Sequence, residues 1–454
     1  MIRKPLKKTT DSAQKTKGRR RKKQNVLFSF CFAFLILTTA CAAKPEARAE
    51  VSAPVSPALS VLAEDHSMAM AAVRGNPISF DVKDFCRATN LSEISSITIT
   101  SLPPVTDGEL RLGNTVLTGA ETISAHNLSL LSYTAGSADI HSSSFRFRVG
   151  DSPVEMTCHL YLLDRVNESP TLSSVPATSL NVSTHQNVTL YGSLPCYDPD
   201  GDPTVIEIVS YPKSGLLTLT DRETGEYTYK PREGASGKDS FTYVARDVYG
   251  NYSAAATVSL TIVKPTTSVV YADLANSPAE NAALTMTEAG IMSGTQVGNE
   301  TFFNPDGLVS RGEFVVMAMN AMGMTETTPA SKTVFADDSE IPESMKSALA
   351  TAYELGYIRG ESGEGNTLSF HPNRSLTRAE AAVILGRMLN AATPTATPIF
   401  TDSEEIPTWA APSIYSLHSL GVILPENGAI SPSSEVTRAD AAQMLSVLMQ
   451  IKNN

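Results

Sequence analysis

The sequence predicts a multidomain chain in which two all-β sandwiches are followed by an all-α bundle of three repeats. Two similar β-rich segments of about 90–100 residues occupy the middle of the chain. Near Tyr271 the spacing of apolar residues changes from about two to about 3.6, the period of a helix. Three units of about 60–67 residues then repeat the same landmarks in the same order to the end of the chain.

The N-terminal segment has the residue order of an export signal. Eleven Lys or Arg residues and one Asp precede Asn25, and an apolar stretch follows at residues 26–43, with small residues after it. This order predicts a secretory signal peptide at residues 1–49. Two alternatives stay open, an uncleaved membrane anchor and lipidation at Cys41. All three place the rest of the chain outside the cytoplasm.

The net charge of the chain argues against one class of partner, nucleic acid. The formal net charge is −11 although the first residues are strongly basic, so the remainder is more acidic still. Nucleic acid is therefore not an expected partner, because phosphates require a basic surface. Residues 50–73 are rich in Ala, Ser, Pro and Val, which is typical of a linker.

The two β-rich segments, at residues 74–166 and 167–264, look like copies of each other. Each has a proline turn, a short strand that starts with glycine, and then a strand with alternating aromatic residues. The matching pieces are Gly108–Leu112 with Gly215–Leu219, and Ser144–Asp151 with Ser240–Asp247. Short alternating strands between Gly, Pro and Asp turns predict a β-sandwich in each copy.

The cysteines are too few for a disulfide framework. Beyond the export segment the chain has Cys86, Cys158 and Cys196, and no C-x-x-C pair. A single bridge between Cys86 and Cys158 is one hypothesis, and three buried free thiols is the other.

The three C-terminal units, at residues 268–330, 331–394 and 395–454, share a set of landmarks. Each opens with an aromatic residue followed two positions later by aspartate, has a helix ending near a glycine, and has a proline six residues before an arginine. The aspartates are Asp273, Asp337 and Asp402, and the arginines are Arg311, Arg378 and Arg438.

Each arginine lies in a four-residue helix start. Ser or Thr stands just before the arginine and an acidic residue two positions after it, as in Thr377-Arg378-Ala379-Glu380. This spacing predicts a capping box, in which both side chains satisfy unpaired backbone N–H groups. Apolar residues at plus 3, 6, 7, 10 and 11 from the arginine predict one buried helical face.

The capping box does not explain the arginine itself. A cation in the first turn of a helix is unfavourable by roughly 0.3–1 kcal/mol, so three such residues imply anionic partners. One hypothesis is an external carboxylate or phosphate, which the guanidinium fork suits. The alternative is an internal salt bridge to Asp273, Asp337 or Asp402.

These landmarks resemble S-layer homology repeats over roughly residues 268–454. The resemblance implies a pseudo-threefold helical bundle that binds secondary cell-wall polysaccharide, often carrying pyruvate ketals, or modified peptidoglycan. By position it implies that Arg311, Arg378 and Arg438 contact the polymer and that Asp273, Asp337 and Asp402 shape the grooves. Trp409 takes the place of an aromatic residue of the family's first helix. Departures at Pro278, Ser344, Gly312 and Pro425 imply that one or two grooves are inactive.

The second β-rich segment resembles the cadherin-like and immunoglobulin-like repeats of bacterial surface proteins, through Asp198–Pro203, Gly225–Pro231 and Gly237–Tyr243. Asp198, Asp200 and Asp202 bring three carboxylates together, which suits Ca²⁺. A cadherin-like calcium site that also uses Asp247 is one interpretation, and a hydrogen-bonded turn is the other. No other cofactor is expected.

The expected function is non-catalytic. The sequence has no nucleophile elbow, zinc-binding pair, P-loop or dinucleotide fingerprint, and every long segment is already assigned to a module. The chain is therefore predicted to be a secreted protein held at the cell wall or S-layer, with the sandwiches as a spacer. Two alternatives are an adhesin whose sandwiches bind a surface ligand and an envelope enzyme that acts on glycan.

Overall fold

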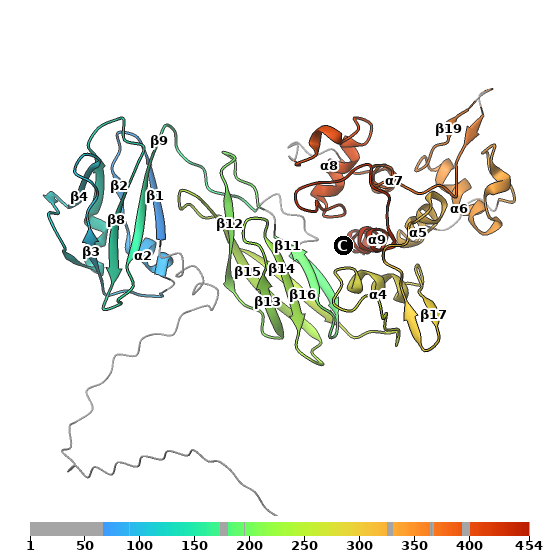
Figure 1. Ribbon diagram of the computed structural model, residues 1–454, viewed down its shortest axis with the longest axis horizontal. Coiled ribbons are helices and arrows are strands. Elements are labelled where there is room, and N and C mark those ends of the chain that lie inside the picture. The colour runs from blue at the N-terminus through green and yellow to red at the C-terminus, as the bar shows by residue number, and fades with distance from the viewer. Residues whose placement is uncertain are drawn as a thin grey trace, which may run out of the picture. The chain divides into compact units, whose positions relative to one another are not determined.

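The computed structural model describes residues 67–453, apart from residues 90, 173–179, 195, 325–329, 364, 366 and 393–399. The predicted signal peptide, its two alternatives, most of the predicted linker at 50–73 and the Thr/Pro-rich segment near residue 395 lie outside the described residues. Up to Val263 the described chain is mostly β-strands, and after Tyr271 it is mostly helices (Figure 1). Among the described helices, none has the length and apolar character needed to cross a membrane.

The first β-rich segment folds as two sheets around one hydrophobic core. One sheet has the order β1-β9-β8-β3-β6 and the other has the order β2-β7-β4-β5. Its strands are β1 (Ser67–Val73), β2 (Ile78–Ser79), β3 (Ser96–Ser101), β4 (Gly108–Leu112), β5 (Thr115–Val116), β6 (Thr122–Ser124), β7 (Leu131–Ala135), β8 (Ser142–Val149) and β9 (Met156–Leu163). A short helix, α2 (Val82–Thr89), and a 3₁₀ helix, η1 (Ala125–Leu130), connect strands.

The strand β1 falls within the segment predicted to be a linker. It pairs in parallel with β9, from Ser67 opposite Thr157 to Val73 opposite Leu163. The sequence SMAMAAV has no clear alternation and is rich in alanine, which is depleted in strands, so local propensity gives no strand signal. The strand forms because its backbone completes the edge of a sheet whose other strands lie far along the chain.

The second β-rich segment has sheets of order β10-β16-β15-β12 and β11-β14-β13. Its strands are β10 (Asn181–His185), β11 (Leu190–Ser193), β12 (Thr204–Ser210), β13 (Gly215–Leu219), β14 (Glu226–Pro231), β15 (Gly237–Asp247) and β16 (Ala256–Val263). In both segments the first strand pairs in parallel with the last, which pairs antiparallel with the strand before it. The two segments therefore share one strand topology, as expected for two copies of one sandwich.

Alternation along the strands builds both cores. In β8, Phe145, Phe147 and Val149 are buried, whereas Arg146 and Arg148 between them are exposed. In β15, Phe241, Tyr243 and Ala245 take the same inward positions. Side chains that alternate across a strand place every second residue on the core face, so the period of two predicted these core residues.

Two tyrosines of β14 pack over glycines on the neighbouring strands. A Cβ atom added to Gly192 would lie 2.5 Å from the ring of Tyr227, and one added to Gly215 would overlap the ring of Tyr229. Tyr229 cannot move away easily, because its hydroxyl donates a 2.8 Å hydrogen bond to Asp239, which also accepts from the backbone of Lys213 and Ser214.

Replacing Gly215 by alanine is therefore expected to destabilise the second sandwich by about 1–2 kcal/mol, through overpacking against a fixed ring. The measurement is the urea midpoint followed by tyrosine fluorescence. Gly119→Ala is the matched control, because an added Cβ there meets nothing within 4 Å. Equal midpoints for both variants would contradict the packing argument.

The three cysteines among the described residues are free thiols, so the structure contains no Cys86–Cys158 bridge. Cys158 is fully buried in the first sandwich core, and burial raises the pKa of its thiol well above the usual value. Cys86 and Cys196 are half-buried. The alternative of free thiols holds for all three, although only Cys158 is completely enclosed.

The C-terminal region consists of helix pairs, but the expectation of an all-α fold is not confirmed. Two short hairpins accompany the first two helix pairs, because backbone N–H and C=O groups between the two helices find partners on the adjoining strand. The helices are α4 (Glu280–Glu288), α5 (Arg311–Ala321), α6 (Glu343–Glu354), α7 (Arg378–Leu389), α8 (Ala411–Ser419) and α9 (Arg438–Asn453). The hairpins are β17 (Thr295–Val297) with β18 (Glu300–Phe302) and β19 (Glu361–Ser362) with β20 (Leu368–Ser369).

The turn before the second helix of each repeat pairs with the same turn in both other repeats. Isolated bridges join Leu308 to Thr437, Ser310 to Ser375, and Thr377 to Glu435. Each repeat therefore contacts both others through its backbone, and the three repeats form a closed ring around one hydrophobic core. The predicted buried face of the second helices lies in this core, with Phe314, Ala381 and Ala441 fully buried.

Candidate functional site

The three predicted capping boxes form at the starts of α5, α7 and α9. In α5 the Ser310 hydroxyl accepts from Glu313 N–H and the Glu313 carboxylate accepts from Ser310 N–H. Thr377 with Glu380 does the same in α7. In α9 the backbone N–H groups of Thr437 and Asp440 bond to each other's side chains at 3.0 and 3.1 Å. Each cap sets the backbone position of the arginine that follows the Ser or Thr, because that arginine is the first residue of the helix.

The aspartate that opens each of the three repeats binds the turn before the second helix of its own repeat. Each carboxylate accepts two backbone N–H bonds of 2.6–2.9 Å from consecutive residues. The second donor in each pair has a left-handed backbone: Asn304 at φ 57°, His371 at 58° and Ser431 at 53°. The pairs are Asp273 with Phe303 and Asn304, Asp337 with Phe370 and His371, and Asp402 with Ile430 and Ser431.

Each helix-start arginine crosses to the next repeat in the ring. Arg311 of the first repeat donates to the Arg359 carbonyl at 3.1 Å and pairs with Glu380 at 3.4 Å. Arg378 of the second donates to the carbonyls of Ile430 and Leu424. It also pairs with Asp440 at 2.8 Å.

Arg438 of the third repeat closes the ring onto the first. It donates to the Phe303 carbonyl at 2.9 Å and the Ser293 carbonyl at 2.8 Å, and its guanidinium lies 4.6 Å from the Phe303 ring centre. The partners of the three arginines are thus carbonyls and capping carboxylates, whereas Asp273, Asp337 and Asp402 bind backbone N–H groups instead. Each of the three arginines therefore links its own repeat to the next one through side-chain hydrogen bonds.

The charge balance differs among the three junctions. Arg378 has a close carboxylate in Asp440, but no carboxylate lies within ion-pair distance of Arg438 among the described residues. Arg311 is 9% exposed, and its Nε has no hydrogen-bond partner among the described residues. Burial lowers the pKa of Arg311, while the charge of Glu380 acts in the opposite direction.

The junction of the first and second repeats contains further arginines that the repeat pattern did not reveal. Arg374 bonds to Glu380 at 2.6 Å and to Glu361 at 3.1 Å. Arg387 on α7 donates to the Tyr357 carbonyl at 3.3 Å. Burial lowers the pKa of Arg387, and the charges of Arg359 and Arg311 lower it further, so these groups lie within electrostatic range. These arginines occur in the second repeat alone, so a comparison of the charged positions of the three repeats would have identified them.

Trp409 lies at the surface two residues before α8, with 57% of its area exposed. An exposed tryptophan offers a flat apolar face with one N–H donor, which suits contact with a sugar ring.

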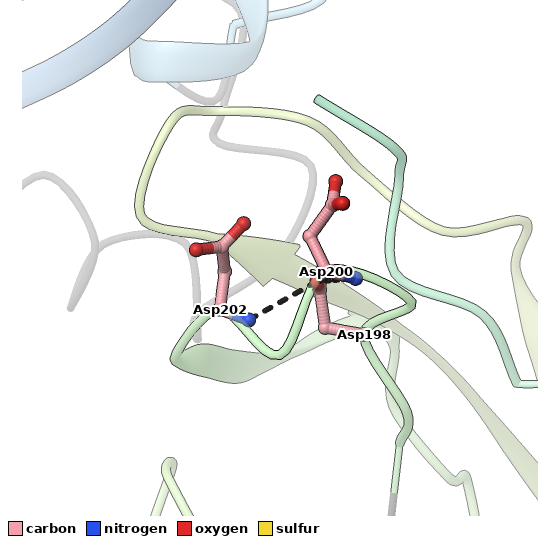
Figure 2. Close-up of side chains that lie close together, drawn as sticks. All are labelled: Asp198, Asp200 and Asp202. Atoms are coloured by element: carbon pink, nitrogen blue, oxygen red, sulfur yellow. Dashed lines mark hydrogen bonds between the residues drawn. The ribbon is translucent and has the colours of Figure 1, made fainter. Parts of the chain in front are cut away.

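The second sandwich brings Asp198, Asp200 and Asp202 together in one turn (Figure 2). One carboxylate oxygen from each lies within 4.8 Å of the others. Asp198 is 7% exposed; its Oδ1 accepts from the backbone of Asp200 and Asp202 at 2.9 and 3.1 Å, and its Oδ2 has no partner among the described residues. Figure 2 shows the Asp200 and Asp202 carboxylates rising on the same side of the turn.

Electrostatics in this turn favour a cation. Burial raises the pKa of Asp202, and the negative charges of Asp198, Asp200 and Asp247 raise it further. Asp247 is buried and accepts from Asn167 Nδ2 at 2.6 Å and from the backbone of Tyr249 and Asn251. Arg165 partly offsets the charge through a 2.9 Å pair with Asp200. The turn is therefore hydrogen-bonded, as one interpretation expected, and it also keeps one buried carboxylate oxygen, Asp198 Oδ2, without a partner among the described residues, as a metal ligand requires.

Comparison with known families gives two matches. The bacterial cadherin-like domain matches residues 167–264, and the S-layer homology domain matches three segments, at residues 270–315, 334–382 and 399–442. The three segments coincide with the three repeats of the ring.

Curated relatives are similar over part of their length. An amylopullulanase of Thermoanaerobacterium thermosulfurigenes is 26% identical over 34% of this chain and 8% of its own. Exoglucanase XynX of Acetivibrio thermocellus is 26% identical over 41% of this chain and 17% of its own. The surface-layer 125 kDa protein of Lysinibacillus sphaericus is 29% identical over 37% of this chain and 14% of its own. The chain thus spans less than a fifth of each relative.

Together, these matches place the chain at the cell surface in association with the cell wall. The chain carries three S-layer homology domains at its C-terminal end, preceded by a bacterial cadherin-like domain.

Proposed function

We propose that this chain is a non-catalytic cell-surface protein held non-covalently on the cell wall, with its S-layer homology domains binding an anionic secondary cell-wall polysaccharide. The two sandwiches then serve as a spacer or an adhesive region. The observation that carries the proposal is the placement of a helix-start guanidinium at all three junctions of the ring, of which only Arg311 and Arg378 have a carboxylate within ion-pair distance among the described residues.

Carbonyl partners support this proposal because they orient a guanidinium without neutralising it. Arg438 keeps a full positive charge beside two carbonyl oxygens, and a polymer anion nearby would lower that energy. The negative net charge of the chain does not oppose binding, since exposed charges are screened over about 8 Å at physiological salt.

The relatives also favour attachment over catalysis. An amylopullulanase, an exoglucanase and a surface-layer protein are proteins of different kinds, yet they resemble this chain over 161, 193 and 172 residues respectively. A segment shared by proteins with different activities is better explained by a common location than by a common reaction.

Extraction of cell envelopes tests the non-covalent attachment. Walls prepared from cells that produce the full chain are washed with high salt and then with urea. The proposal expects urea to release the chain at its intact mass, because unfolding the ring destroys the binding surface. A chain that stays on the wall in urea and leaves only after wall digestion would be covalently linked, which contradicts the proposal.

The acidic turn supports a second function for the cadherin-like domain, the binding of Ca²⁺ by Asp198, Asp200 and Asp202. Calcium takes carboxylate oxygens as ligands, and the buried Asp198 Oδ2 has no other partner among the described residues. The ion would balance the negative charge of this turn that Arg165 leaves uncompensated.

At a calcium concentration ten times its dissociation constant, we expect the domain to be stabilised by about 1.4 kcal/mol. Thermal unfolding of the full chain with calcium and with a chelator measures the shift. Asp198→Asn should abolish the shift, whereas Asp221→Asn in an exposed turn of the same sandwich should keep it. Identical melting curves with and without calcium would exclude the site.

A further inference from the structure

The second S-layer homology domain has three arginines that its neighbours lack. Arg374 precedes the helix-start arginine by four residues, where the other repeats have Gly307 and Ser434. Arg387 follows it by nine residues, where the others have Asn320 and Val447. All four counterparts are uncharged.

The structure itself defines the counterparts of Arg359. The carbonyl of Arg359 accepts from Arg311, that of Leu424 accepts from Arg378, and that of Ser293 accepts from Arg438. These three residues therefore occupy the same place at the three junctions, and only the first junction has a charged side chain there.

The extra arginines gather around Arg311. Arg374 and Arg311 share the carboxylate of Glu380, with contacts of 2.6 and 3.4 Å. The charges of Arg359 and Arg311 both act on Arg387. Within the described part of this junction, the four arginines have only two carboxylates at ion-pair distance: Glu380, which contacts Arg311 and Arg374, and Glu361, which contacts Arg374. At least two positive charges remain uncompensated.

A buried donor at the same place also lacks a partner. Arg311 is more than nine-tenths buried, and its Nε finds no acceptor among the described residues. An unpaired charged donor in a cluster of like charges is costly, and an anionic oxygen would relieve both problems. Neither of the other two helix-start arginines has this defect, because the Nε groups of Arg378 and Arg438 donate to carbonyls at 2.9 Å.

The exposed members of the cluster can reach a ligand. Arg359 and Arg374 are exposed, and Arg387 is half-buried. Their planar forks can each bind two oxygens of a carboxylate or a phosphate. At the second junction Asp440 already pairs with Arg378, and at the third junction Arg438 is a single guanidinium. A polymer anion therefore meets less uncompensated positive charge at either of them than at the first junction.

We propose that the junction between the first and second S-layer homology domains is the main anion site of this chain, formed by Arg359, Arg374 and Arg387 around Arg311, and that it holds a carboxylate or phosphate group of a wall glycan. Arg378 and Arg438, at the other two junctions, then serve chiefly to link neighbouring domains through hydrogen bonds. This inference rests on the proposed function, since it assumes that the domains bind an anionic polymer.

The test compares three forms of the full chain. The first is unchanged, the second carries Arg359→Gln, Arg374→Gln and Arg387→Gln, and the third carries Lys264→Gln, Lys332→Gln and Lys452→Gln. The lysine variant loses the same charge at exposed positions that do not belong to the arginine cluster. Binding to purified walls is measured by sedimentation, and binding to polyglycerol phosphate, polygalacturonate and neutral dextran by calorimetry. Circular dichroism confirms that each form is folded.

The arginine variant should lose about 10- to 100-fold in affinity for walls, and the lysine variant should change less than about twofold. Preference for polyglycerol phosphate or for polygalacturonate identifies the anion as phosphate or carboxylate. If the arginine variant does not fold, Arg359→Glu at an exposed position replaces it and should lose about 10-fold.

The outcomes separate the two claims. Equal binding by the unchanged and arginine-substituted chains would overturn this site while leaving wall attachment intact. Equal losses in the arginine and lysine variants would overturn it as well, because the effect would then be general charge. Failure of the unchanged chain to bind walls would overturn both claims.

Discussion

Replacing Glu380 by glutamine is expected to destabilise the C-terminal ring by about 3–4 kcal/mol. Glu380 caps α7 and is also the carboxylate shared by Arg311 and Arg374. Its loss leaves the buried guanidinium of Arg311 without a counter-charge, and uncompensated buried charges are among the costliest defects in a protein. Urea unfolding followed by circular dichroism gives the change in free energy.

Glu313→Gln provides a matched control for this variant. Glu313 caps α5 in the same manner but is exposed and has no arginine within ion-pair distance among the described residues. We expect this variant to lose about 1 kcal/mol or less, the usual contribution of a cap. If both variants lose the same amount, the junction charge contributes nothing and only the cap matters.

Acid should reproduce the effect of the Glu380 substitution. Burial opposes ionisation of Glu380, but the hydrogen bonds from Arg374 and from the backbone of Thr377 outweigh it, so its pKa lies below the usual 4.5. A lowered folded-state pKa means that the stabilisation is complete above pH 4.5 and disappears as the pH falls through the lower value. The Glu380→Gln variant should therefore lose less stability than the unchanged chain below pH 4.5.

Replacing Arg438 by glutamine is expected to open the ring and to cost about 2–3 kcal/mol, because two charge-assisted hydrogen bonds to carbonyls are lost. Its guanidinium joins the last helix to the carbonyls of Phe303 and Ser293 in the first repeat. Hydrogen exchange should quicken in α4 and α9, which pack on each other, and stay unchanged in α6.

Arg359→Gln is the control for this second prediction, because it removes a guanidinium from an exposed position while the backbone carbonyl that Arg311 uses is retained. It should change stability by less than about 0.5 kcal/mol. Faster exchange spread evenly over all six helices would mean that Arg438 stabilises the whole ring and does not specifically close it.

Features that depend on residues close together in the sequence could be predicted. The capping boxes and buried helix faces follow from residues within one turn of each other, such as Ser310 with Glu313. The two sandwich copies follow from alternation along single strands. Both patterns are visible because the interacting residues are neighbours or share one element.

Features that depend on distant partners could not be predicted. The role of Asp337 depends on its hydrogen bond from the backbone N–H of His371. The left-handed backbone conformation of His371 could not be predicted from any sequence pattern. Arg438 binds carbonyls at Phe303 and Ser293, and carbonyls are present at every residue, so sequence offers no means of choosing among them. The strand β1 likewise forms only because β9 is available.

The most direct test of wall attachment is sedimentation of the full chain with purified walls before and after the anionic polymer is removed with hydrofluoric acid. We predict that the chain sediments with intact walls, stays in solution with stripped walls, and is released from intact walls by added free polymer. Equal sedimentation with intact and stripped walls would contradict the account, because the domains would then recognise something other than the acidic glycan.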